Sequence, residues 1–187
     1  EIYTLSLHDA LPIYHELFRI YGSHVTINNL ALDRVTPCTG NMIRLQPSSG
    51  FTTTGGRIDG RNTLNTGSFN GIVLSEVPGS SFRDIHLTGV TVRNLGYGLF
   101  QSNKATSTVD KVVVDGCTFT GNTKDDLEFN APKATLRGVE VRRSRFSNNR
   151  GASTRYGFGV GLAHVTGAVI ADNTFTGYRS EDRKSVV

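Results

Sequence analysis

Three features of the sequence predict an all-β solenoid made of short strands. Apolar residues alternate with polar ones over short runs, and Gly, Asn, Ser and Thr separate these runs. No segment of the chain shows clear helical periodicity. The runs also recur at an interval of about 27 residues, and a constant period of this length is the signature of a repeat architecture.

The repeat is clearest when Val109–Asn122 (VDKVVVDGCTFTGN) is aligned with Leu136–Asn149 (LRGVEVRRSRFSNN). Weaker copies precede and follow these two. One hydrophobic marker per copy recurs at intervals of 27, 27 and 29 residues, at Val92, Phe119, Phe146 and Phe175. Counting back at a similar interval predicts earlier markers at Leu64 and Leu32. The chain is therefore expected to form roughly six coils, the incomplete ends included.

Each copy contains three short apolar pieces: a V-x-V strand, a strand around the Phe, and a third piece after an Asn turn. This arrangement predicts a right-handed parallel β-helix, in which every strand pairs with its equivalent in the next coil about 4.8 Å away. Inward side chains then stack in columns, one of which is expected to bury the thiol of Cys117. Asn122 and Asn149 are expected in the turn, because Asn tolerates left-handed backbone and can bond its neighbours along the stack.

A leucine-rich repeat is the main rival fold. The spacing Val114-x-x-Cys117-x-Phe119-x-x-Asn122 fits its consensus. Leucine is not dominant, however, and the segments between copies, such as DDLEFNAP, show strand periodicity rather than helical periodicity. These two features favour the β-helix.

Both ends of the chain read as translated sequencing adapter. Residues 1–13 (EIYTLSLHDALPI) can be back-translated as a common adapter. The reverse complement of the codons chosen for His8–Ile13, GAT CGG AAG AGC GTC GTG, encodes Asp182–Val187. We therefore expect residues 1–13 and 182–187 to be artefacts, and residues 14–181 to be a fragment of a longer protein that forms one β-helix domain.

Composition sets limits on the partners. The formal net charge is +4, and the basic residues are scattered rather than gathered in a stripe, which argues against nucleic acid. No stretch is long and apolar enough for a transmembrane helix, so no membrane insertion is expected. The two cysteines, Cys38 and Cys117, are too few for a disulfide framework or a zinc site. No cofactor is expected, although carboxylate oxygens leave Ca²⁺ open.

The repeats VVVDGCTFTGN, VEVRRSRFSNN and AVIADNTFTGY resemble those of the pectate-lyase-like superfamily of right-handed parallel β-helices. The resemblance covers most of residues 14–178 and rests on the repeat, not on a catalytic motif. It implies a carbohydrate-active protein, since the superfamily contains polysaccharide lyases, glycoside hydrolases, epimerases and phage tailspike depolymerases, along with adhesins. A polygalacturonase-type set of motifs is matched only at Asp125–Asp126, and His164 is followed by Val165 where that set has Gly.

The segment Asn122–Pro132 (NTKDDLEFNAP) carries the candidate catalytic residues, Asp125, Asp126 and Glu128. If Leu127 and Phe129 point inward, Asp126 and Glu128 point outward on one strand face, about 6.6 Å apart. That distance approaches the carboxyl separation used by glycoside hydrolases. A cation clamp and ordinary solvated carboxylates are the alternatives for this pair.

Neighbouring coils supply the candidate substrate-binding residues. Tyr97 and Phe100 could stack on a sugar ring, and Gln101 could bond its hydroxyls. Arg155 and Tyr156 lie on an inserted turn and could bind a carboxylate on the substrate. Glycines beside Leu99 and Val160 are expected to leave room above the sheet.

Two functions are consistent with these residues. One is a polysaccharide-degrading enzyme, a hydrolase or a lyase resembling a tailspike depolymerase, that acts on an acidic or complex glycan. The other is a non-catalytic glycan-binding, adhesin or tailspike-shaft module. Either implies an extracellular, cell-surface or virion location with a glycan partner, and a homotrimer if the chain derives from a tailspike.

Overall fold

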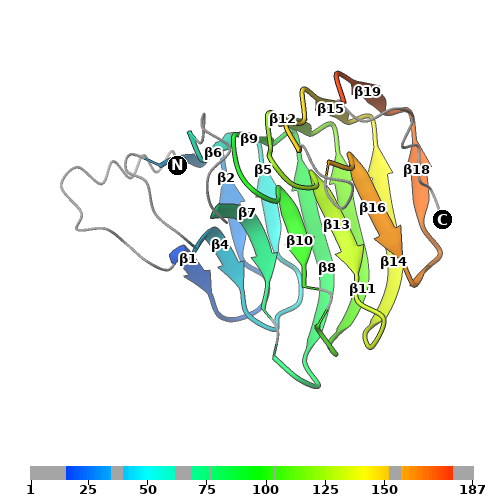
Figure 1. The fold of residues 1–187 in the computed structure, drawn as a ribbon. Coiled ribbons are helices and arrows are strands. Elements are labelled where there is room, and N and C mark those ends of the chain that lie inside the picture. Colours follow the sequence, from blue (N-terminus) through cyan, green and yellow to red (C-terminus); the bar gives the residue numbers. More distant parts are fainter. Residues whose placement is uncertain are drawn as a thin grey trace.

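The computed structural model describes residues 16–34, 40–61, 69–75, 77–102, 104–151 and 157–178. These residues form a parallel β-solenoid of about five turns, drawn as a ribbon in Figure 1. The parallel β-helix predicted from the repeat is thus confirmed, with a count somewhat below the roughly six coils expected. The described ranges contain strands in three parallel sheets and no helix, so the leucine-rich repeat is excluded. These ranges also contain no helix that could span a membrane.

Three parallel sheets form the walls of the solenoid. Sheet A contains β1 (Glu16–Ile20), β4 (Gly40–Leu45), β7 (Phe69–Leu74), β10 (Leu99–Gln101), β13 (Leu127–Asn130) and β16 (Val160–Ala163). Sheet B contains β2 (Thr26–Asn28), β5 (Thr52–Thr54), β8 (Ser81–Thr88), β11 (Thr108–Asp115), β14 (Thr135–Arg142) and β17 (Val165–Thr166), and β18 (Val169–Ala171) also pairs with β14. Sheet C contains β3 (Ala31–Asp33), β6 (Arg57–Asp59), β9 (Thr91–Arg93), β12 (Thr118–Thr120), β15 (Arg145–Ser147) and β19 (Thr174–Thr176).

The hydrophobic markers of the repeat stack in one column of sheet C. Phe119 pairs in register with Val92 on one side and with Phe146 on the other, and Phe146 pairs with Phe175. The rings of Phe119 and Phe146 lie 5.1 Å apart, and those of Phe146 and Phe175 lie 4.8 Å apart, nearly parallel in both pairs. This spacing equals the distance between neighbouring strands, so the column follows directly from the constant repeat length.

One earlier marker is predicted wrongly. Val92 pairs with Ile58, not with Leu64, and Ile58 in turn pairs with the expected Leu32. The coil between Ile58 and Val92 is longer than the later coils, so a fixed interval counted back from Val92 ends inside the extra residues. Leu64 itself lies outside the described residues.

The core fills the space between the three sheets. Phe119, Phe146, Phe129 and Phe82 are fully buried, and Cys117 is a buried free thiol, as expected from its position in the repeat. Burial raises the pKa of this thiol to about 11, so it stays protonated and unreactive at neutral pH. The last coil is less covered, because Phe175 ends the ring column with 45% of its surface exposed.

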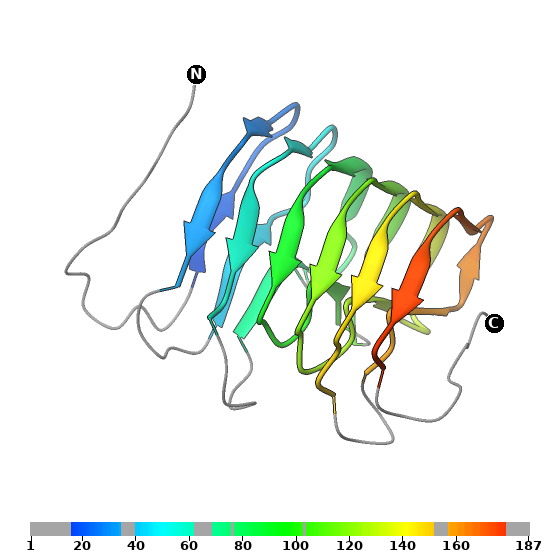
Figure 2. The ribbon, with the colours of Figure 1, turned by 90° about the horizontal axis from the view of Figure 1, so that it is seen from above.

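Each coil turns through left-handed backbone at recurring positions. Between sheets C and A the same turn position has φ of 54° at Asn94, 65° at Gly121, 52° at Asn148 and 70° at Gly177. Gly and Asn are the residues that adopt this conformation at least cost. Figure 2 shows the consequence: successive coils lie side by side in sequence order, so equivalent turns form a row along one edge of the solenoid.

Candidate active site on sheet A

The candidate carboxyl groups lie at the start of β13 in sheet A. Leu127 and Phe129 are fully buried, as predicted, and Glu128 lies between them on the outer face with partial exposure. Glu128 pairs in register with Phe100 of the preceding coil and with Gly161 of the following coil. The strand alternation therefore places Glu128 on the surface beside an aromatic residue and a glycine.

The prediction that Asp126 shares this outer face is wrong. Asp126 is fully buried, and its side chain is bonded inside the coil. Its Oδ1 accepts hydrogen bonds from Asn122 Nδ2 at 2.7 Å and from Asn149 Nδ2 at 3.2 Å, and its Oδ2 accepts one from the Tyr178 hydroxyl at 2.5 Å. Both turn asparagines thus converge on this carboxyl, and Asn122 Oδ1 also accepts the backbone N–H of Leu95 in the preceding coil, a bond along the stack as expected. The left-handed backbone expected at Asn122 and Asn149 lies one residue earlier, at Gly121 and Asn148.

The local backbone explains why Asp126 points inward. Asp126 precedes β13 and lies in the turn, so the two-residue alternation of the strand does not extend to it. The equivalent positions in neighbouring coils are Gly98 and Gly159, and a side chain built there would meet interior rings. A Cβ on Gly98 would lie 2.7 Å from the Phe119 ring, and one on Gly159 would lie 2.7 Å from the Phe175 ring.

The prediction that these two glycines leave room above the sheet is therefore wrong. Their missing side chains allow the turn to pack against the core rings. Gly161 is the glycine that does leave space outside. A Cβ on Gly161 would meet only ordinary contacts, including Glu128 Cγ at 3.9 Å.

Asp125, not Asp126, is the partner of Glu128. The charge of Asp125 acts on the pKa of Glu128, and Glu128 in turn acts on the pKa of Asp125. Asp125 is almost completely buried, and its Oδ1 accepts backbone hydrogen bonds from Gly157 at 2.8 Å and Phe158 at 2.9 Å. The two N–H donors hold Asp125 in place, so Asp125 presents a fixed oxygen to the more exposed Glu128.

The environment of this pair keeps one proton near neutral pH. Burial raises the pKa of Asp125 to about 6, against the lowering effect of the two backbone N–H groups. Burial, together with the charge of Asp125, raises the pKa of Glu128 to about 7, although a hydrogen bond with Tyr97 and the charge of Lys124 oppose this shift. Two carboxyl groups in contact cannot both ionise readily, so Glu128 is the member that carries the shared proton.

An aromatic pair lies next to these carboxyl groups. The rings of Tyr97 and Phe100 stack with centroids 4.3 Å apart and planes 11° apart. Lys124 Nζ lies 4.8 Å from the centroid of the Tyr97 ring, which is a cation–π contact. The structure thus brings together Tyr97, Phe100, Asp125 and Glu128, four of the residues singled out from the sequence, and adds Lys124, which the sequence analysis did not select.

Three further residues were predicted to bind substrate: Gln101, Arg155 and Tyr156. Gln101 is fully buried and donates from Nε2 to Ser107 Oγ at 2.7 Å, so its predicted contact with a substrate at the surface is wrong. The reason is strand alternation, since Gln101 follows inward Leu99 by two residues. Arg155 and Tyr156 lie outside the described residues.

No group of three or more His, Cys, Asp or Glu side chains that could hold a metal ion is present in the described ranges. Asp126 is engaged by three neutral donors, and Asp125 by two backbone N–H groups. Tyr97, in contact with Phe100 and Lys124, is only 9% exposed, so Phe100 is the ring that a sugar can meet. What the arrangement offers is proton transfer at Glu128 beside Phe100.

Comparison of the chain with protein-family models, with curated proteins and with solved structures found no match. The fold itself is shown by the parallel sheets and their register.

Proposed function

We propose that this protein is a carbohydrate-active β-helix that degrades a polysaccharide, with Glu128 as the proton donor to the glycosidic oxygen. The observation that carries the proposal is the contact of a proton-sharing carboxyl pair, Asp125 and Glu128, with the stacked rings of Tyr97 and Phe100. Phe100 is the more exposed of the two rings, and an aromatic ring presents an apolar face that packs on the C–H face of a sugar. An acid with a pKa near 7 transfers protons efficiently at neutral pH.

The same geometry limits the reaction. Glycoside hydrolases that use two carboxyl groups hold them about 5–5.5 Å or about 6.5–9.5 Å apart and bring both to the substrate. Asp125 is almost completely buried and is bonded to two backbone N–H groups, so it does not reach a sugar in this way. Asp126 is buried and does not supply the second group. A lyase fits this face better, because one group can serve both halves of an elimination. Ionised Glu128 takes the proton from the carbon beside the substrate carboxylate and passes it to the glycosidic oxygen as the C–O bond breaks. Lys124, which lies over the Tyr97 ring, supplies a cation for that carboxylate.

The experiment compares the wild-type chain with Glu128→Gln on a panel of acidic and neutral polysaccharides. Reducing ends report any cleavage, and ultraviolet absorbance of an unsaturated product reports elimination. We expect the variant to lose activity by about 10²- to 10⁴-fold, as is usual when a general acid is removed. Glu140→Gln is the matched control, because Glu140 is a partly exposed Glu that pairs with Arg142 on sheet B.

Equal activity in both variants and the wild type would overturn the role of Glu128. A non-catalytic glycan-binding module is the second candidate, and one observation favours it: Asp125 and Asp126, the carboxyl groups next to Glu128 in the sequence, are both buried. That candidate predicts glycan binding without any product, so binding and product release are measured on the same panel.

A further inference from the structure

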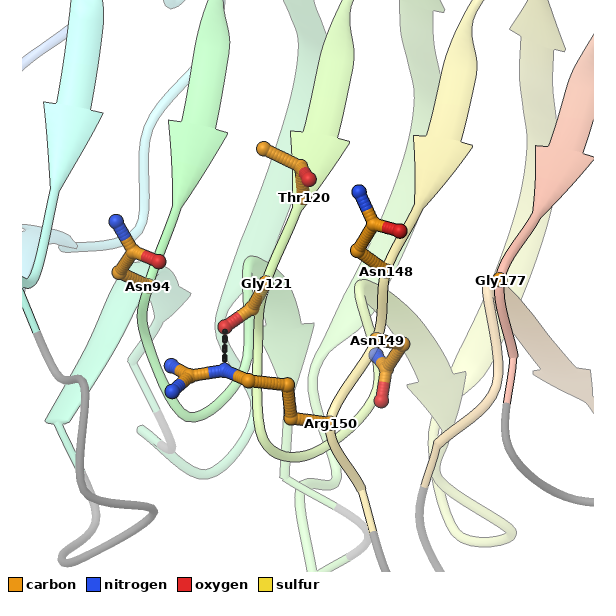
Figure 3. Close-up of a pocket in the computed structure, with 7 residues that line it drawn as sticks. All are labelled: Asn94, Thr120, Gly121, Asn148, Asn149, Arg150 and Gly177. Atoms are coloured by element: carbon orange, nitrogen blue, oxygen red, sulfur yellow. Dashed lines mark hydrogen bonds between the residues drawn. The ribbon is translucent and has the colours of Figure 1, made fainter.

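A polar hollow lies at the turns that follow the strands of sheet C. This corner pocket occupies about 430 Å³ between sheets C and A and is open to solvent. Figure 3 shows the residues that line it, Asn94, Thr120, Gly121, Asn148, Asn149, Arg150 and Gly177. Asp125, Glu128 and Tyr97 do not line it, so it is a separate site.

The row of left-handed turn residues creates the hollow. Asn94, Gly121, Asn148 and Gly177 occupy the same turn position in successive coils, so asparagine and glycine alternate. A Cβ on Gly121 would lie 2.8 Å from Asn94 Oδ1, and one on Gly177 would lie 2.7 Å from Asn148 Oδ1. Gly121 therefore leaves a space next to Asn94 Oδ1 that the side chain of any other residue would fill.

Arg150 places a fixed cation in this hollow. Its Nε donates to the carbonyl oxygen of Gly121 at 2.8 Å, and its backbone N–H donates to the carbonyl oxygen of Asn122 at 2.7 Å. Figure 3 shows the guanidinium lying across Gly121 toward Asn94. A guanidinium has five N–H donors in a planar fork, so the bond from Nε sets the plane in which an anion can be bound.

The neighbouring groups offer both an acceptor and a donor. Asn94 Nδ2 donates to Asp59 Oδ1 at 3.0 Å, and this bond orients Asn94 Oδ1 toward the hollow as an acceptor. The Thr120 hydroxyl oxygen accepts a hydrogen bond from Ser147 Oγ at 3.1 Å, which leaves the Thr120 O–H proton to donate. A cation, an acceptor and a hydroxyl donor thus converge in one polar space.

We propose that the corner pocket binds a small polyhydroxylated carboxylate, that is, a sugar acid. Hydroxyl groups of the ligand pair with Asn94 and Thr120, and its carboxylate pairs with Arg150. The volume falls within the range of about 300–1,000 Å³ that is usual for small-ligand sites. Arg150 is the one cationic side chain among the described residues that line the pocket, which suits a carboxylate of single charge better than a phosphate of double charge.

The test uses ligand-observed NMR titrations of the full chain with glucuronate, glucose and acetate as probes. We expect glucuronate to bind in the millimolar range and at least about tenfold more tightly than glucose or acetate, because only glucuronate engages both the cation and the hydroxyl partners. Arg150→Gln should weaken glucuronate binding by about tenfold or more. Arg145→Gln is the matched control, since Arg145 is an exposed arginine on the neighbouring β15 that does not line the pocket.

Three outcomes would overturn the inference: no glucuronate binding, equal binding of acetate and glucuronate, or equal losses in the two arginine variants. Asn94→Leu gives a second check that keeps the charge, and it should weaken glucuronate more than acetate. Glu128→Gln is scored by polysaccharide cleavage, whereas Arg150→Gln is scored by glucuronate binding. Failure of the carboxyl pair as a catalyst and failure of the corner pocket as a binding site are therefore read from different variants.

Discussion

Asp126 and Glu128 are separated by a single residue, yet their carboxyl groups lie on opposite sides of the coil wall. Asp126 lies inside, fully buried, and is bonded to Asn122, Asn149 and Tyr178. Glu128 lies outside, partly exposed, against Asp125 and Tyr97. Burial raises the pKa of both groups to about 7.

The difference shows that a raised pKa does not by itself mark a catalytic acid. Desolvation acts on both carboxyl groups, but only Glu128 can meet a substrate. Asp126 instead joins two successive turns and Tyr178, which follows β19, into one buried polar cluster. Substitution of Asp126 should therefore lower stability, whereas substitution of Glu128 should lower activity.

The largest expected effect is the loss of stability caused by Asp126→Ala. Removal of this carboxyl leaves the side-chain donors of Asn122, Asn149 and Tyr178 without an acceptor inside the coil. Because buried unsatisfied donors cost about 1–3 kcal/mol each, we expect the free energy of unfolding to fall by about 3–5 kcal/mol. Urea denaturation followed by circular dichroism measures this loss. Glu128→Ala should lose no more than about 1 kcal/mol, and equal losses would contradict the inside–outside distinction.

How far the sequence predicts these positions depends on the regularity of the backbone. The Phe119–Phe146–Phe175 column follows from the repeat, because a parallel register stacks equal positions. The inward position of Gln101 was available from the same alternation, two residues after Leu99. The inward turn of Asp126 was not, since alternation fails outside the strand; the glycines at the equivalent positions, Gly98 and Gly159, were the signal.

The partner of Glu128 was beyond the sequence for a different reason. Asp125 is held by the backbone N–H groups of Gly157 and Phe158, which belong to the next coil. A contact made by backbone groups leaves no pattern of side chains to read. Lys124 was missed as well, because its role depends on its position over the Tyr97 ring.

The second effect is the pH dependence of stability, compared between the wild type and Asp126→Asn. Burial raises the pKa of Asp126 to about 7 from an ordinary value of 3.8, so the folded state holds this proton more tightly than the unfolded state. Stability from the protonated form is fully present below pH 3.8 and is lost as the pH rises through about 7. The Asn variant cannot titrate at this position.

We therefore expect the melting temperature of the wild type, relative to that of Asp126→Asn, to fall as the pH rises over this window. Differential scanning calorimetry at several pH values measures the gap. If the melting temperature of the wild type instead rises relative to that of Asp126→Asn as the pH rises, the three donors favour the carboxylate more than burial opposes it. The pKa of Asp126 would then be lowered in the folded state, not raised.

A smaller loss of stability is expected for Tyr178→Phe. The variant removes one hydrogen bond, from the Tyr178 hydroxyl to Asp126 Oδ2, and keeps the ring that packs 6.5 Å from Phe175. We expect the free energy of unfolding to fall by about 1–2 kcal/mol, measured by urea denaturation. Tyr21→Phe is the control, because Tyr21 is 68% exposed, and it should change stability by less than about 0.5 kcal/mol. A similar result for both would mean that Tyr178 does not close the buried cluster.

The smallest expected effect is the most specific to the outer face. Asp125→Asn removes the charge that helps to raise the pKa of Glu128, so that pKa should move from about 7 toward its usual range. Carbon-13 NMR of the Glu128 carboxyl during a pH titration reports the shift directly, whether or not a substrate is known. Any activity that requires protonated Glu128 should then decline at lower pH than in the wild type.

Tyr97→Phe should shift the pKa of Glu128 in the opposite direction, upward, because the Tyr97 hydrogen bond lowers that pKa. Opposite shifts in the two variants are the signature of one coupled site, whereas an unchanged titration in both would separate Glu128 from its neighbours.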